Sequence, residues 1–75
     1  MIPIDINQLL CDYEEDLQRV EHKIRKLFLQ ESACHAAGDH QAAWKLAQER
    51  VSYMRVRRDL LYAMGEMTRG RGGDP

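Results

Sequence analysis

The sequence has little of what usually stabilises a short chain or builds an active site. It holds two cysteines, two prolines and one tryptophan, and four of its five glycines lie within the last eleven residues. No stretch approaches the ~18 uncharged residues of a transmembrane helix, and no glycine repeat indicates collagen. With 44% hydrophobic residues the composition excludes a disordered chain. Seventy-five residues allow one domain, which is shorter than most enzyme folds require.

The scarcity of cysteine limits how such a chain can be stabilised. Domains of this size usually add disulfides, a metal ion or a partner subunit to their small core. Cys11 and Cys34 would lie more than ~30 Å apart on one continuous helix, which excludes a disulfide between them. The first residues also lack the basic and apolar regions of a secretory signal. We therefore expect a cytoplasmic protein with reduced thiols that assembles with a partner.

Apolar residues at alternating spacings of four and three predict a first helix over about residues 6–37. This heptad series consists of Ile6, Leu10, Tyr13, Leu17, Val20, Ile24 and Leu27, and continuing it reaches Glu31 and Cys34. Asp5 is suited to cap the helix, with Gln8 reaching back as in a capping box.

A connection of only two residues, 38–39, predicts that the next helix lies antiparallel to the first. Gly38 suits the left-handed conformation that ends a helix, and Asp39 suits the cap of a second helix over about 40–68. The fold class is therefore all-α: an antiparallel two-helix hairpin over residues 1–68, followed by a disordered Arg/Gly tail at 69–75.

The second helix carries two apolar stripes, which form an arc wider than one partner helix covers. We expect the first stripe to face helix one, giving an intrahairpin core of Leu10, Tyr13, Leu17, Val20, Ile24, Leu27, Ala47, Val51, Met54 and Leu61. We expect the second stripe to face a partner through Leu46, Tyr53, Val56, Leu60 and Met67. Two hairpins would then form a homodimeric four-helix bundle. The alternative is a monomeric hairpin that presents this stripe to another protein.

The distribution of charge favours the antiparallel arrangement. Residues 1–21 contain six acids and one base, whereas residues 49–75 contain six bases and four acids. With a turn centred on Gly38, Glu21 is expected beside Arg55, Asp16 near Arg58 and Lys26 near Glu49. Exposed pairs of this kind contribute only ~0–1 kcal/mol each, so they select register more than they stabilise.

Arginines suggest a second function, a dimeric regulator that binds nucleic acid. The candidate contacts are Arg55, Arg57 and Arg58 on the second helix and Arg69 and Arg71 among the terminal glycines. The net charge of −1 and the isoelectric point near 6.3 disfavour this function, since such proteins are usually basic.

Residues that could bind metal or perform catalysis form no recognisable motif. Cys34, His35 and His40 cluster near the turn, but their spacing matches no zinc pattern, so we expect no metal and no cofactor. Glu14, Glu15 and Asp16 are consecutive and fan around the helix, so we expect neither an enzyme nor a small-molecule substrate. The first helix is too acidic for a membrane-surface helix. The sequence thus favours a non-enzymatic helical protein that acts by protein–protein binding, as an adaptor, inhibitor or regulatory subunit.

Overall fold

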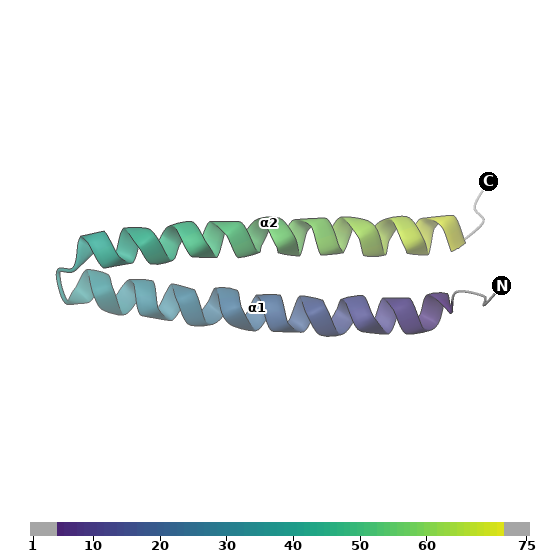
Figure 1. Ribbon diagram of the computed structural model, residues 1–75, viewed down its shortest axis with the longest axis horizontal. Coiled ribbons are helices and arrows are strands. Elements are labelled where there is room, and N and C mark those ends of the chain that lie inside the picture. The colour runs from purple at the N-terminus through teal and green to yellow at the C-terminus, as the bar shows by residue number, and fades with distance from the viewer. Residues whose placement is uncertain (1–4, 72–75) are drawn as a thin grey trace.

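The computed structural model describes residues 5–71, whose backbone forms two long helices joined by a tight turn. Helix α1 comprises Ile6–Ala36 and helix α2 comprises His40–Arg71. They run antiparallel along an elongated body of 55 × 26 × 16 Å, with the outer ends of both helices far from the turn (Figure 1). The expected all-helical hairpin is confirmed, and the boundaries of α1 agree with the prediction to within one residue.

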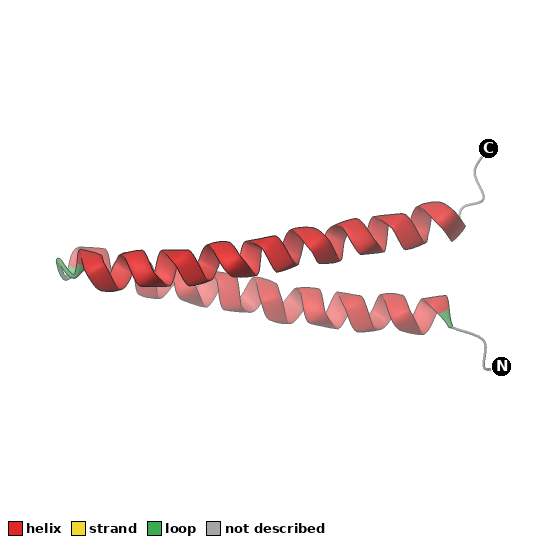
Figure 2. Cartoon of the chain, turned by 45° about the horizontal axis from the view of Figure 1, so that its top comes forward, coloured by secondary structure: helices red, strands yellow, loops and turns green. Residues whose placement is uncertain are grey.

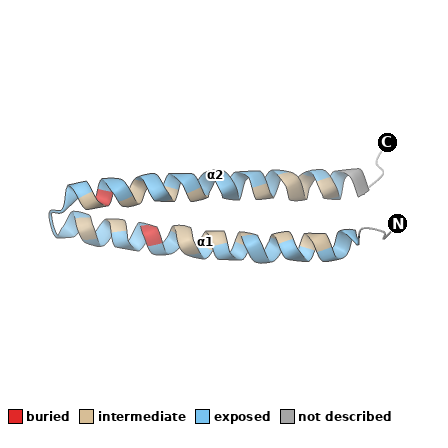
Figure 3. Ribbon diagram, in the orientation of Figure 1, coloured by how far each residue is buried: buried red, intermediate tan, exposed pale blue. Residues whose placement is uncertain are grey.

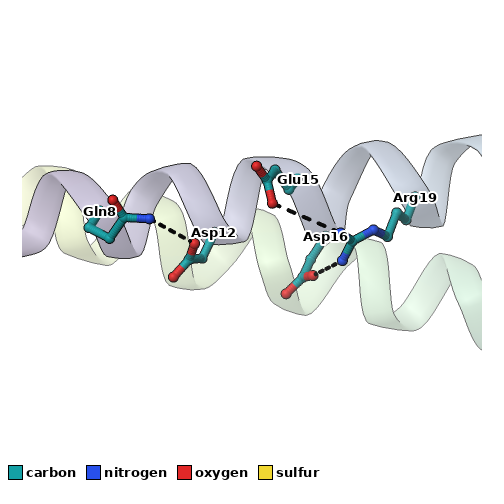
Figure 4. A network of polar contacts seen from close by, with 5 residues as sticks. All are labelled: Gln8, Asp12, Glu15, Asp16 and Arg19. Atoms are coloured by element: carbon teal, nitrogen blue, oxygen red, sulfur yellow. Dashed lines mark hydrogen bonds and ion pairs between the residues drawn. The ribbon is translucent and has the colours of Figure 1, made fainter.

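The cap of α1 forms through Asp5, as predicted. Its Oδ1 atom accepts hydrogen bonds from the backbone N–H groups of Asn7 at 3.0 Å and Gln8 at 3.3 Å. The capping box does not form, because the side chain of Gln8 instead donates to Asp12 one turn further along (Figure 4). The helix start therefore depends on the aspartate alone.

The turn has the hydrogen bonds of a Schellman motif. Gly38 adopts a φ of 81°, its N–H donates to the carbonyl of His35, and the N–H of Asp39 donates to that of Cys34 at 2.8 Å. The Oδ1 atom of Asp39 then accepts the N–H of Ala42 at 3.1 Å and caps α2. The three residues 37–39 thus end α1 and begin α2. So short a connection fixes the two helices as antiparallel neighbours.

The end of α2 differs from the prediction. The helix continues to Arg71 rather than ending near residue 68, so residues 69–71 are helical and not part of a tail. The glycines at 65 and 70 do not interrupt the helix, because neither adopts the positive φ that ends α1 at Gly38. The remainder of the expected tail, residues 72–75, lies outside the described residues.

Each helix contacts the other through a seam, a row of residues that recur at spacings of three and four. On α1 every seam residue from Leu10 to Cys34 is half-buried or buried, as expected. On α2 the seam is a different set from the one predicted, and its members again recur at spacings of three and four: Ala43, Leu46, Arg50, Tyr53, Arg57, Leu60, Met64 and Met67.

The predicted roles of the two apolar stripes are therefore reversed. Val51, Met54 and Leu61, expected between the helices, are exposed, while Ala47 beside them is half-buried. Leu46, Tyr53, Leu60 and Met67, expected to face a partner, are half-buried on the side that meets α1. The reason is that Arg50 and Arg57 take up seam positions and pair with acids of α1, which rotates α2 relative to the expected orientation.

The hairpin buries very little of its apolar surface. Only Leu27 and Ala43 are buried among the described residues, at 2% and 0% exposure, and Figure 3 shows both buried positions in the half of the hairpin nearer the turn. Towards the free ends the helices cross obliquely and separate (Figure 2), as ridges-into-grooves packing predicts for straight helices. The radius of gyration is 17.1 Å, against ~11 Å for a compact domain of this length. The core thus consists of the single row of side chains between the two helices.

Candidate interaction surface

A half-buried ion pair between Arg50 and Glu31 lies in the seam and holds α2 against α1. Arg50 donates through Nε to Glu31 Oε2 at 2.8 Å and through a second nitrogen to Oε1 at 3.4 Å. The side chains are 25% and 14% exposed, and the Arg50 guanidinium also lies 5.8 Å from the ring centre of Phe28. This hydrogen bonding holds the pKa of Glu31 below its ordinary value, against a smaller opposing effect of desolvation. A charged, two-pronged contact therefore replaces an apolar layer of the seam.

A second inter-helix pair joins Arg57 to Glu21 at 3.4 Å, and Lys23 lies 6.0 Å from the ring centre of Tyr53. Both contacts are consistent with the expected antiparallel pairing of an acidic first half with a basic second helix. The partners differ in detail, because Glu21 pairs with Arg57 and not with Arg55.

The other expected cross-helix pairs do not form. Asp16 pairs with Arg19 on its own helix at 3.2 Å, within the network of Figure 4, and Arg58 contacts its neighbour Asp59 at 3.4 Å. Lys26 and Glu49 form no ion pair with any residue the structure describes. All of these side chains are exposed, where water competes with the ion pair.

The apolar residues displaced from the seam form a continuous exposed stripe on α2. This outer stripe recurs at spacings of three and four, with Arg58 occupying one of its positions, and consists of Trp44, Ala47, Val51, Met54 and Leu61. Its large members are 40–61% exposed. The spacing is that of a second coiled-coil seam, rotated from the first by about one residue. Within the hairpin, α1 packs against the first of these seams, and the outer stripe is exposed.

The outer stripe continues onto α1 through Phe28. An open groove between the helices is lined by Ile24 and Phe28 of α1 and by Arg50 and Met54 of α2. Phe28 is 54% exposed, and its ring centre lies 5.8 Å from the guanidinium of Arg50, which also lines this groove. The exposed apolar area therefore spans both helices on one side of the hairpin.

Val56 is the only member of the expected partner stripe that is exposed, at 45%. It lies five residues from Val51, which corresponds to about 140° around a helix. The two valines have nearly equal exposure but lie on opposite sides of α2, and only the side of Val51 carries further large exposed apolar residues in register.

The arginines proposed for nucleic-acid binding are mostly engaged. Arg57 pairs with Glu21, Arg58 with Asp59 and Arg69 with Glu66, the last at 2.9 Å. Arg55 is exposed and forms no ion pair with a described residue. Arg71 is the last residue of α2. Among the four candidate arginines whose side chains the structure describes, only Arg55 is without an ion pair, which further disfavours that function.

No helix within the described residues is both long enough and apolar enough to span a membrane. Comparisons of the chain with protein-family models, with curated proteins and with solved structures found no match.

Proposed function

We propose that this protein is a non-enzymatic helical hairpin that acts by protein–protein binding, and that its first partner is a second copy bound through the outer stripe of α2. The observation that carries the proposal is the stripe itself: four large apolar side chains in heptad register, 40–61% exposed, beside a hairpin core of two buried residues. Exposed apolar surface in a continuous patch is typical of interaction sites.

The exposed area supports an interface of ordinary size. The accessible surface of the chain is 6049 Å², about 1,300 Å² more than the ~4,700 Å² of a compact monomer of 8.7 kDa. A stable protein–protein interface buries ~800 Å² on each partner. A second copy could therefore bury the excess with one face of this elongated molecule.

The stripe is also complementary to itself in one antiparallel register. With a twofold axis between positions 52 and 53 of α2, residue i of one copy lies opposite residue 105 − i of the other. This arrangement pairs Trp44 with Leu61, Val51 with Met54, and the small Ala47 with the long Arg58. Each layer then combines side chains of different size, as interdigitation requires, and the same patch serves both copies.

Matched valine variants test the proposal. In light scattering coupled to gel filtration, we expect the unmodified protein to have the mass of a dimer at micromolar concentration. Val51→Asp should give a monomer, because it buries a carboxylate at the twofold axis, while circular dichroism still reports a helical protein. Val56→Asp is the control, with the same chemical change at 45% instead of 44% exposure; it should remain dimeric.

Two results would overturn this assignment. A strictly monomeric unmodified protein at ~100 μM would exclude self-association, since a weak standard interface still dimerises there. Dissociation by Val56→Asp but not by Val51→Asp would place the interface on the opposite side of α2, where the sequence alone had located it.

A further inference from the structure

The turn brings two imidazole rings from different helices into contact. His35 lies in the last turn of α1 and His40 is the first residue of α2. A hydrogen bond of 3.0 Å joins their Nδ1 atoms, with one ring donating and the other accepting, and the ring centres are separated by 5.2 Å. Both side chains are exposed, so both rings are accessible to ions in solution. The Schellman motif holds the backbones that carry them.

The separation of the two nitrogens matches the bite of a chelated metal ion. Imidazole nitrogens bind divalent transition metals at about 2.0–2.1 Å. Two nitrogens 3.0 Å apart at that bond length subtend an angle of about 91–97° at the metal. A tetrahedral ion would require them to be ~3.3–3.4 Å apart, so a small rotation of the two exposed rings admits either geometry, and the bound ion replaces the proton of the hydrogen bond.

We propose that His35 and His40 form a two-histidine site for copper(II), and more weakly for nickel(II), at the tip of the hairpin. Copper(II) is the strongest divalent binder of nitrogen ligands in its row, and tetragonal nitrogen and oxygen sites are typical of copper and nickel. No group of three His, Cys, Asp or Glu side chains within residues 5–71 is arranged to hold a metal. Water therefore completes the coordination, and the protein supplies two adjacent ligands.

Binding at this place stabilises the closed hairpin. The two ligands belong to helices on either side of the turn, so the ion links the last turn of α1 to the first turn of α2. In the unfolded chain the same side chains, five residues apart, are not held at this separation. An ion that binds the folded state more tightly shifts the folding equilibrium towards it.

Copper titration of three matched variants tests the site. Calorimetry with copper(II) alone, in a non-coordinating buffer, is expected to give one ion per chain. His35→Gln and His40→Gln should each weaken binding about 100-fold, because removing one ligand removes the chelate effect. His22→Gln is the control, since His22 is also exposed on α1 but has no histidine contact within the described residues; its binding should equal that of the unmodified protein. Circular dichroism is expected to show that all variants remain helical.

The order of metals and the mass of the complex complete the test. We expect affinity to fall from copper(II) to nickel(II) to zinc(II), and the mass per particle to stay unchanged on metal addition. Equal binding by all three histidine variants, or a loss confined to His22→Gln, would overturn the site. Tighter binding of zinc than copper would contradict the assignment, which rests on the affinity order of divalent metals for nitrogen ligands, and a metal-dependent doubling of mass would show that the ion bridges two chains instead.

Discussion

The two helices are nearly equal in length, at 31 and 32 residues, yet they differ in what they place along their common seam. The seam of α1 is apolar from Leu10 to Leu27 and becomes polar only at Glu31. The seam of α2 carries Arg50 and Arg57 at two positions, and its large apolar residues are divided between the seam and the outer stripe. The apolar residues of α1 in heptad register therefore form one series, with Phe28 and Leu29 exposed outside it, whereas those of α2 form two. The difference leaves most of the exposed apolar residues in heptad register on α2.

The largest difference between the seam and the outer stripe is expected when one leucine of each is replaced by alanine. Leu27→Ala should lower the free energy of unfolding by about 2 kcal/mol or more, because Leu27 is 2% exposed in the seam between the helices. Leu61→Ala, at 40% exposure on the outer stripe, should cost the isolated hairpin less than ~1 kcal/mol. Urea unfolding followed by circular dichroism, at concentrations where the protein is monomeric, measures both. Equal losses would mean that the outer stripe also faces α1.

Two glycines test the ends of the same helices with effects of opposite sign. Gly38→Ala should destabilise the hairpin by about 1 kcal/mol, because a φ of 81° is costly for any residue with a Cβ atom. Gly65→Ala should stabilise it by ~0.5–1 kcal/mol, since this glycine is inside α2 and an added Cβ would meet nothing within 4 Å. Thermal unfolding of both variants checks the signs, and two losses would contradict a continuous α2 at residue 65.

Lowering the pH should weaken the charged part of the seam and leave the apolar part unchanged. This is the smallest change in stability that we expect. Arg50 holds the pKa of Glu31 below its ordinary value of 4.5, so the folded state binds this proton less readily than the unfolded chain. The stabilisation by this pair is therefore complete above the unfolded pKa and is lost as the pH falls through the lower folded pKa. The melting temperature should decrease on acidification below about pH 4.5, and less so in Glu31→Gln, which has no carboxyl group at this position to titrate.

The sequence predicted the helices and the turn because their signals are local. Asp5, Gly38 and Asp39 act through neighbouring backbone groups, and the heptads of α1 are uninterrupted. The face of α2 was predicted wrongly because two arginines occupy seam positions, and counting only apolar residues selects the outer stripe instead. The signal was present: the spacing from Ala43 through Arg50 and Arg57 to Met64 is an unbroken seven-residue period, and Glu31 continues the heptad of α1. Recognising complementary charges within both heptads would have identified the pairing.

The contact between His35 and His40 could not be predicted in the same way. Their separation of five residues is not a spacing that brings side chains together on one helix. Their contact depends on the left-handed turn at Gly38 and on the rotamers of both rings, which only the structure places.

The position of the turn at one extremity of a 55 Å body has a consequence for any antiparallel pair of these hairpins. In the proposed register, position 40 of each copy lies about 19 Å along α2 from the twofold axis, at ~1.5 Å per residue. The two tips would then point in opposite directions, almost 40 Å apart. The assembly would carry one histidine pair towards each end, about 9 Å short of the point where the partner's α2 ends at Arg71. Two paramagnetic copper ions at that distance would act as a built-in molecular ruler, and their dipolar coupling would report the register directly.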